Sequence, residues 1–308
     1  MNKIAFIFPG QGAQYIGMGK EFYEQNEESK KIFDLASNAV GFDLPALCFE
    51  ENDRLNITEY TQIAMLTVSV ATMAAIKELG LSPVATGGLS LGEYGALVAA
   101  DIIDFEDACK LVRKRGLYMQ SEVPVGQGGM AAVLGLDASV IEAVCEDSEG
   151  IVQIANYNCP GQIVISGEKS AVEAVEAPLK EAGAKRVVML NVSGPFHSPM
   201  LKGAGDKLGQ ELESVTINDI KIPYVANVTG GFVDSKEDVK DLLKRQVYSS
   251  VKWQQCFEAM VASGIDTFIE IGPGKTLSSF AKKINKEVKV YNVDKYEDLE
   301  TLKVALSL

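Results

Sequence analysis

Histidine is almost absent from this sequence of 308 residues, which has one, at position 197. A metal cluster built on histidine ligands is therefore nearly impossible. Cysteine is scarce as well: the five residues are scattered, odd in number and include no Cys-x-x-Cys pair. This pattern argues against a disulfide framework or a zinc site, and it predicts a reducing, cytoplasmic environment.

The sequence also lacks any apolar run long enough for a leader or a membrane span. The run 4–8 is short and ends at a proline and a glycine, so we expect no signal peptide. The longest apolar segment, 63–76, is interrupted by three hydroxyl side chains and is shorter than a bilayer requires. It predicts a buried helix.

Positive charge is in deficit, because 29 lysine and arginine residues face 42 aspartate and glutamate residues, for a formal net charge of -13. An acidic surface disfavours nucleic acid and anionic membranes as partners. What remains is the composition of an ordinary globular protein, 47% hydrophobic, long enough for one large domain or two smaller ones.

Short apolar strands alternate with helices along most of the chain. We predict strands at 4–8, 84–85, 223–227, 267–271 and 288–293, and helices at 19–39, 56–79, 93–100 and 104–123. This alternation is typical of an α/β fold with a mainly parallel sheet.

The pattern changes after a glycine-rich break at 126–129. We predict strands at 130–134, 152–156, 162–166 and 186–190, with helices at 139–146 and 171–182. The order βαββαβ is the ferredoxin-like arrangement. The sequence therefore predicts an inserted α+β subdomain at 128–191 and one discontinuous larger domain formed by 1–127 and 192–308.

The stretch Gly88-Leu89-Ser90-Leu91-Gly92 has the Gly-x-Ser-x-Gly pattern of a nucleophile elbow, a sharp turn between a strand and a helix. Such a turn exposes the Ser90 hydroxyl, and the Leu91 amide then points at an oxygen bound above it. The same pattern occurs by chance in glycine-rich turns, so the pentapeptide alone leaves both interpretations open.

Glycines flank Gln11 in the loop after the first strand and let a ligand approach the backbone closely. This loop can supply a second oxyanion amide, cradle a phosphate, or simply connect a strand to a helix. The phosphate interpretation is weak, because neither a Walker A pattern nor a full Gly-x-Gly-x-x-Gly is present.

Two further side chains suit a serine-based site. His197 is the one histidine that can act as base for Ser90, and a glycine and two prolines stiffen its loop. The alternative is a purely structural histidine. Arg115 follows the elbow segment and can bind a carboxylate in the same pocket, or it belongs to a solvated basic face with Arg113 and Lys114. No acidic residue stands out as a partner that would orient His197.

Motifs along nearly the whole chain resemble those of malonyl-CoA:acyl carrier protein transacylases of type II fatty acid synthesis. They are Phe8-Pro9-Gly10-Gln11-Gly12, Thr61-Gln62, Gly88-Leu89-Ser90-Leu91-Gly92-Glu93, Arg115-Gly116, Asn156-Tyr157-Asn158, Gly194-Pro195-Phe196-His197-Ser198 and Gln246-Val247. Each motif is common alone, but the set in this order is highly specific. The resemblance implies a hydrolase-like core with an inserted ferredoxin-like subdomain.

The resemblance also implies an activity: transfer of malonyl from malonyl-CoA to the phosphopantetheine thiol of acyl carrier protein, with no bound cofactor or metal. It assigns catalysis to Ser90, His197 and Gln246, the oxyanion hole to Gln11 and Leu91, and substrate binding to Arg115, Gln62, Asn158 and Phe196. In this scheme a carbonyl of Gln246 orients His197, Arg115 pairs with the malonyl carboxylate, and Phe196 disfavours a branched methylmalonyl group.

Two positions depart from the family pattern. Leu89 stands where a histidine is usual, which removes polarity beside Ser90 without removing the base. Pro195 stands where alanine is frequent, and we expect it to stiffen the His197 loop.

Two competing hypotheses remain. One is a serine esterase or thioesterase that uses Ser90 and His197 with water as acceptor, and the other is a module that only binds acyl carrier protein. We expect a monomer whose ends lie near the limits of the fold, although a domain of a larger synthase is conceivable.

Overall fold

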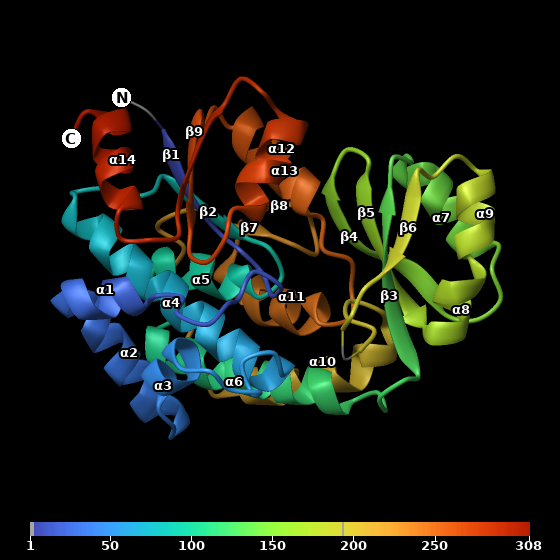
Figure 1. Ribbon diagram of the computed structural model, residues 1–308, viewed down its shortest axis with the longest axis horizontal. Coiled ribbons are helices and arrows are strands. Elements are labelled where there is room, and N and C mark those ends of the chain that lie inside the picture. Colours follow the sequence, from blue (N-terminus) through green and yellow to red (C-terminus); the bar gives the residue numbers. More distant parts are fainter. Residues whose placement is uncertain (1–2, 193) are drawn as a thin grey trace.

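The computed structural model describes residues 3–192 and 194–308; residues 1, 2 and 193, which fall in the predicted large domain, lie outside the described residues. The chain forms two parts that lie side by side (Figure 1). The larger has helices around a parallel sheet, and the smaller has an antiparallel sheet with helices beside it.

The larger part is built on a parallel sheet with the strand order β10-β9-β1-β2. Its strands are β1 (Ile4–Phe8), β2 (Ala85–Gly88), β9 (Thr267–Ile271) and β10 (Lys289–Val293). Every residue of β2 and β9 is buried, as expected for a sheet covered on both faces. The α/β class with a mainly parallel sheet is therefore confirmed. Phe8 pairs with Gly88 in parallel strands, so the loops after β1 and β2 both leave from the carboxyl ends of the strands.

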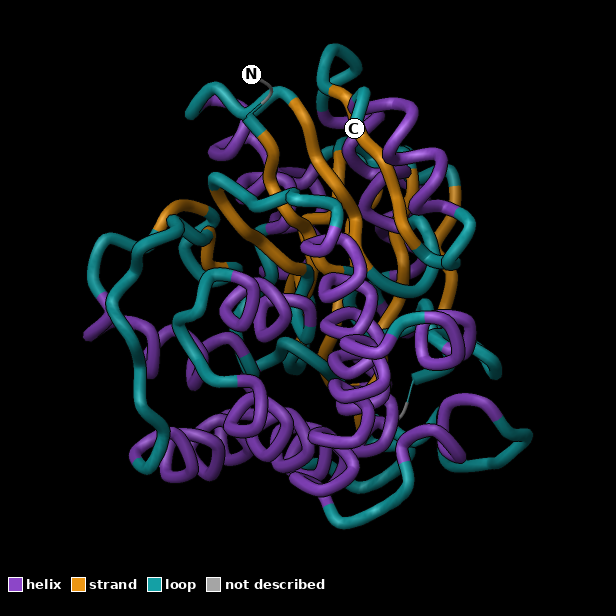
Figure 2. Tube along the Cα trace, turned by 90° about the vertical axis from the view of Figure 1, so that its left-hand side faces the viewer, coloured by secondary structure: helices purple, strands orange, loops and turns teal. Residues whose placement is uncertain are grey.

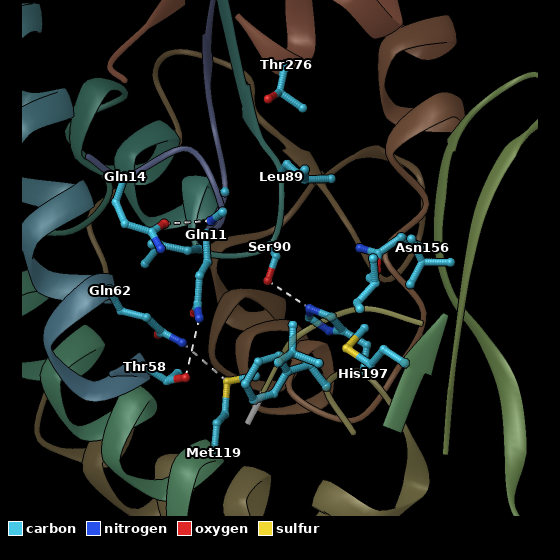
Figure 3. Close-up of a pocket in the computed structure, with 18 of the residues that line it drawn as sticks. Gln11, Gln14, Thr58, Gln62, Leu89, Ser90, Met119, Asn156, His197 and Thr276 are labelled. Carbon is cyan, nitrogen blue, oxygen red and sulfur yellow. Dashed lines mark hydrogen bonds between the residues drawn. The ribbon is translucent and has the colours of Figure 1, made fainter. Parts of the chain in front are cut away.

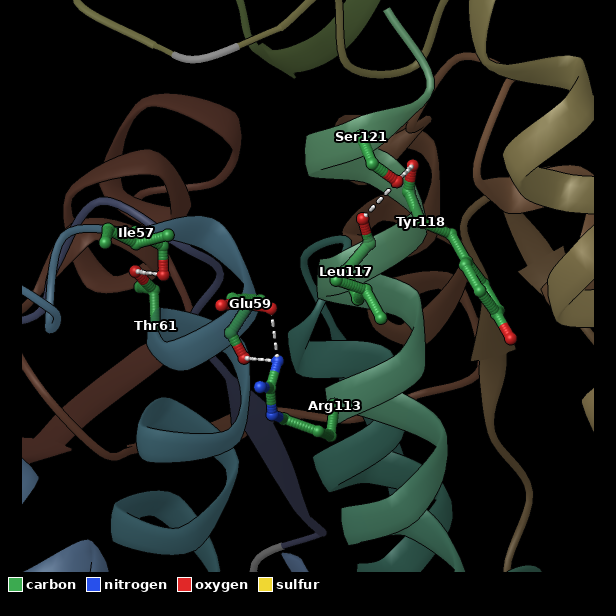
Figure 4. A network of polar contacts seen from close by, with 7 residues as sticks. All are labelled: Ile57, Glu59, Thr61, Arg113, Leu117, Tyr118 and Ser121. Carbon is green, nitrogen blue, oxygen red and sulfur yellow. Dashed lines mark hydrogen bonds and ion pairs between the residues drawn. The ribbon is translucent and has the colours of Figure 1, made fainter. Parts of the chain in front are cut away.

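The predicted buried helix is α4 (Thr58–Glu78). It packs against α2 (Glu27–Val40), α5 (Gly92–Ala99), α6 (Phe105–Ser121) and β9. An ion pair of 2.7 Å between Arg113 Nη1 and Glu59 Oε2 joins α6 to the start of α4 (Figure 4). Figure 2 shows the long helices gathered along one side of the molecule, below the strands. The other helices of this part are α1 (Lys20–Gln25), α2 (Glu27–Val40), α3 (Leu44–Phe49), α5 (Gly92–Ala99), α10 (Lys202–Glu213), α11 (Val239–Gln246), α12 (Trp253–Ala262), α13 (Thr276–Ile284) and α14 (Asp298–Leu306), with 3₁₀ turns at Pro199–Leu201 and Lys236–Asp238.

The smaller part is an antiparallel sheet with the strand order β4-β5-β3-β6. Its strands are β3 (Gly128–Leu134), β4 (Val152–Cys159), β5 (Gln162–Glu168) and β6 (Arg186–Met189), and its helices are α7 (Ala138–Glu146), α8 (Lys169–Ala174) and α9 (Glu176–Glu181). The helices pack on the sheet through a separate apolar cluster that includes Val133, Ile141 and Leu179.

Two predicted helices are each broken into two in the structure. The helix 19–39 is broken at Asn26, whose extended backbone and side-chain bond to the Ser29 amide cap a new helix. The helix 171–182 is broken at Val175, because Pro178 has no N–H to continue the ladder.

The predicted strand 223–227 is also different from what the sequence suggested. Only Val225–Ala226 forms a strand, β7, and it pairs antiparallel with β8 (Gly231–Phe232). Tyr224 makes a single parallel bridge to Thr86 of β2. Pro223 cannot donate a ladder hydrogen bond, so the segment stays at the sheet edge.

Across residues 3–192 and 194–308, no helix combines the length and apolar character that crossing a membrane requires.

Candidate active site

Ser90 lies in the turn between β2 and α5 with a φ of 52°, a conformation that side chains other than glycine rarely adopt. The turn is closely packed: a Cβ on Gly92 would lie 2.1 Å from the Phe8 carbonyl oxygen. Asn227 stabilises it on both sides, since its Oδ1 accepts from the Ser90 amide at 2.6 Å and its Nδ2 donates to the Gly88 carbonyl at 2.7 Å. These contacts hold the serine in its strained backbone conformation.

His197 lies beside Ser90 although 107 residues separate them in the chain. Its Nε2 is 2.8 Å from Ser90 Oγ, and the two side chains point toward each other (Figure 3). Its Nδ1 is 2.8 Å from the backbone carbonyl oxygen of Gln246. A carbonyl oxygen can only accept, so Nδ1 carries the proton of the neutral ring and Nε2 is free to accept from the serine hydroxyl.

The surroundings of His197 keep its ring neutral. Burial and the charge of the nearby Arg115 lower the pKa of His197 to about 3, although the bond to Gln246 opposes this shift. At neutral pH the imidazole is therefore unprotonated at Nε2 and available as a base.

Arg115 is 1% exposed and reaches the same serine from α6. Its Nη2 donates to Ser90 Oγ at 3.1 Å and to Gln246 Oε1 at 3.0 Å, and its Nη1 donates to Gln62 Oε1 at 2.7 Å. Arg113, two residues earlier, lies on another face of the helix and pairs with Glu59. Of the two interpretations of this basic run, the structure places Arg115 in the pocket.

A cavity of about 840 Å³ lies between the two parts of the chain and contains this serine. Its lining includes most of the residues singled out in the sequence: Gln11, Gln62, Ser90, Leu91, Arg115, Asn158, Phe196 and His197. Gln246 is fully buried and lies behind His197 and Arg115 rather than at the cavity surface. Leu89 also lines the cavity, so an apolar side chain does lie beside Ser90.

Gln11 and Leu91 follow the parallel strands β1 and β2, so their backbone amides lie in loops at the carboxyl ends of these strands. Within the described part of the chain neither amide donates a hydrogen bond, whereas the Gln11 side chain donates to Thr58 Oγ1 at 3.3 Å. Among the described residues, neither backbone N–H therefore has an intramolecular acceptor.

Sequence reasoning missed the role of two buried residues, Asn227 and Glu93. Glu93 is 1% exposed in the first turn of α5, and its Oε2 accepts from Gln246 Nε2 at 2.7 Å and from the Asn227 amide at 3.1 Å. Asn227 is the last residue of the segment 223–227, which was predicted as a strand of the main sheet, and a polar residue at a strand end was the available signal.

Comparison with known proteins gives consistent matches over nearly the whole chain. The family described as Acyl transferase domain matches residues 5–303. A malonyl CoA-acyl carrier protein transacylase of Bacillus subtilis (strain 168) is 46% identical, over 99% of this chain and 97% of that protein.

Solved structures agree with the sequence matches. The malonyl CoA-acyl carrier protein transacylase of Clostridium perfringens ATCC 13124 superposes with a TM-score of 0.97 at 47% identity, over 99% of this chain and 97% of that one. The structure of a type II PKS acyl-carrier protein in complex with its malonyl-transacylase gives a TM-score of 0.94 at 39% identity, over 97% of this chain and 98% of the matched chain.

Proposed function

Because the chain belongs to the acyl transferase family, among the malonyl CoA-acyl carrier protein transacylases, we propose that it moves malonyl from malonyl-CoA to acyl carrier protein for fatty acid synthesis. One observation carries this proposal: a buried guanidinium, that of Arg115, lies 3.1 Å from the hydroxyl of Ser90 inside the cavity. A serine hydrolase of simple esters needs no such group, whereas a substrate with a free carboxylate does.

The first step is formation of a malonyl ester. The proton of Ser90 Oγ passes to Nε2 of His197 while Oγ attacks the thioester carbonyl. The Gln246 carbonyl holds the ring through Nδ1 and stabilises the imidazolium. Negative charge on the former carbonyl oxygen is met by the amides of Gln11 and Leu91, and each such donor is typically worth about 10²–10³ in rate.

The first step ends when the C–S bond of the thioester breaks, and the second step reverses it with a different thiol. CoA leaves as a thiol with the proton from His197, and the malonyl ester stays on Ser90 with its carboxylate on Arg115. In the second step the phosphopantetheine thiol of acyl carrier protein gives its proton to His197 and attacks the ester carbonyl. The bond from that carbonyl carbon to Ser90 Oγ breaks, Oγ takes the proton back from His197, and malonyl-acyl carrier protein is released. Gln62 Oε1 holds the guanidinium in place at 2.7 Å, and Asn158 and Phe196 form walls of the same cavity.

We also infer a two-domain organisation, with an inserted ferredoxin-like subdomain at 128–191 and a discontinuous hydrolase-like domain at 1–127 and 192–308. The strand order β4-β5-β3-β6 and the separate apolar cluster of the smaller part support this division. The five cysteines are unpaired and buried, in keeping with a cytoplasmic enzyme. The expected monomeric state remains a prediction, which sedimentation equilibrium would test.

Steady-state kinetics with two substrates test the proposed reaction. Initial rates over a matrix of malonyl-CoA and acyl carrier protein concentrations should give parallel double-reciprocal lines, as expected for a covalent intermediate. Malonyl-acyl carrier protein should be the main product. Intersecting lines would contradict the two-step transfer, and free malonate as the main product would favour the serine thioesterase.

A further inference from the structure

The reaction described above makes no use of the carboxyl group of Glu93, although it lies inside the site. Glu93 is 1% exposed, three residues after Ser90 in the first turn of α5. A carboxylate can be buried at moderate cost only when donors satisfy it. Here both donors bond to Oε2: Gln246 Nε2 at 2.7 Å and the backbone N–H of Asn227 at 3.1 Å.

Each of these two donors also holds part of the catalytic pair. Gln246 Nε2 contacts the Ser90 carbonyl oxygen at 2.9 Å, and the backbone carbonyl of Gln246 binds His197 Nδ1 at 2.8 Å. Asn227 Oδ1 accepts from the Ser90 amide at 2.6 Å. One carboxylate oxygen is therefore connected, through a single residue in each case, to the nucleophile and to the ring of the base.

We propose that Glu93 is a positioning residue for Ser90 and His197, acting in its ionised form through Gln246 and Asn227. The inference rests on the proposed function, because it assumes that Ser90 is acylated with help from His197. Glu93 touches neither substrate nor reacting atoms in this scheme.

The charge of Glu93 matters because of how its two oxygens are placed. Oε2 accepts both hydrogen bonds, while Oε1 has no partner among the described residues. A proton on Oε1 would leave a buried hydroxyl unsatisfied, and a proton on Oε2 would compete with Gln246 and Asn227. Protonation thus weakens the bonds that hold the pair, because an ionised acceptor makes the stronger hydrogen bond.

The groups facing Glu93 allow it to titrate near neutrality. Burial raises the pKa of Glu93 to about 7, and the bonds from Asn227 and Gln246 and the charge of Arg115 limit the rise. Burial also raises the pKa of Tyr94, the next residue on α5, and that of Tyr224 and Cys256 from neighbouring segments, so these groups are neutral. His197, with its pKa lowered to about 3, is neutral too.

These assignments predict an acid limb in Ser90 acylation that belongs to Glu93. The rate should fall as pH drops through about 7, whereas protonation of His197 would act only at much lower pH. The experiment measures single-turnover acylation by malonyl-N-acetylcysteamine, which carries no phosphate, between about pH 5.5 and about pH 9, by rapid quench and intact mass. The folded fraction is measured in parallel by circular dichroism.

The main variant is Glu93→Gln, which keeps the shape and an acceptor oxygen but cannot ionise. We expect its acylation rate at high pH to fall on the order of 10-fold to 100-fold, with substrate affinity little changed and the limb near pH 7 gone. Glu93→Asp keeps an ionisable group and should retain an acid limb with a reduced rate.

Glu270→Gln is the matched control. Glu270 is a fully buried carboxylate of β9 that binds the Leu277 and Ser278 amides and the Ser278 hydroxyl, away from the catalytic pair. Its loss should lower stability and leave the rate per folded molecule and the pH midpoint unchanged.

The outcomes separate the inference from the function on which it rests. A wild-type rate and midpoint in Glu93→Gln would overturn the positioning role while leaving Ser90 acylation intact. If that variant does not fold, a wild-type rate in Glu93→Asp would overturn it equally. Failure of the wild-type protein to acylate at all would instead refute the proposed function.

Discussion

Replacing Arg115 by alanine should change which acyl group the enzyme prefers. In the free site the guanidinium donates to neutral acceptors only: Gln62 Oε1 at 2.7 Å, Gln246 Oε1 at 3.0 Å and Ser90 Oγ at 3.1 Å. A malonyl carboxylate would offer an ionised acceptor in place of a neutral one, and acetyl offers none. Because Arg115 is 1% exposed, solvent screens little of the difference between malonyl and acetyl in their interaction energy with the guanidinium.

The size of the effect follows from the hydrogen bonds involved. A hydrogen bond to a charged group is worth about 1.5–3 kcal/mol. Taking about 2–3 kcal/mol for the gain with malonyl, the ratio of kcat/KM for malonyl-CoA to that for acetyl-CoA should fall by about 30-fold to about 150-fold in Arg115→Ala. Both absolute values should fall as well, because the bonds to Ser90 and Gln246 are lost, but that loss cancels in the ratio.

The assay is acyl transfer to acyl carrier protein from each of the two CoA esters. Arg113→Ala is the matched control: it removes the same side chain two residues earlier on α6, where Arg113 pairs with Glu59 and lies 4.7 Å from the Tyr60 ring centroid. Its ratio should equal that of the wild type. Equal losses for malonyl and acetyl in Arg115→Ala would refute the assigned role.

Three further predictions concern the turn, the buried carboxylate and the pocket wall. Gly92→Ala would place a Cβ 2.1 Å from the Phe8 carbonyl oxygen, so it should lower the melting temperature and abolish acylation of Ser90. The control Gly231→Ala, whose Cβ would meet nothing within 4 Å, should match the wild type in both thermal unfolding and acylation. Because the folded protein holds the Glu93 proton more tightly than the unfolded chain does, that group stabilises the fold at low pH and the contribution is lost as pH rises through about 7. The free energy of unfolding of Glu93→Gln minus that of wild type should therefore rise by about 3 kcal/mol between about pH 4.5 and about pH 8 in urea titrations, and a flat difference would contradict the raised pKa. Phe196→Ser should enlarge the cavity that Phe196 lines and so raise the ratio of methylmalonyl to malonyl transfer. An unchanged ratio would show that Phe196 does not select against the branched acyl group.

Much of the fold was visible in the sequence, because local patterns determine it. The strands 4–8 and 267–271 have the predicted bounds, and α4 is buried as its long, mostly apolar segment 63–76 indicated. The breaks at Asn26 and Val175 were missed, since one depends on a side-chain cap and the other on a single proline within an otherwise helical pattern.

The site was predictable only in part for a different reason. Ser90 has a local motif and His197 is the one histidine, so residue chemistry was enough to name them. Gln246 contributes through a backbone carbonyl, which any residue type carries, and its place came from the family resemblance alone. Asn227 and Glu93 lie 134 residues apart in the chain and meet through packing, so no local pattern could place them together.

The central claim is a malonyl group carried covalently on Ser90. It is tested most directly by intact-protein mass spectrometry after mixing with malonyl-CoA, on wild type and on Ser90→Ala. We expect a single malonyl adduct on the wild type that disappears when acyl carrier protein is added, and none on the variant. An adduct of equal yield on Ser90→Ala, or an adduct that acyl carrier protein does not remove, would contradict the account.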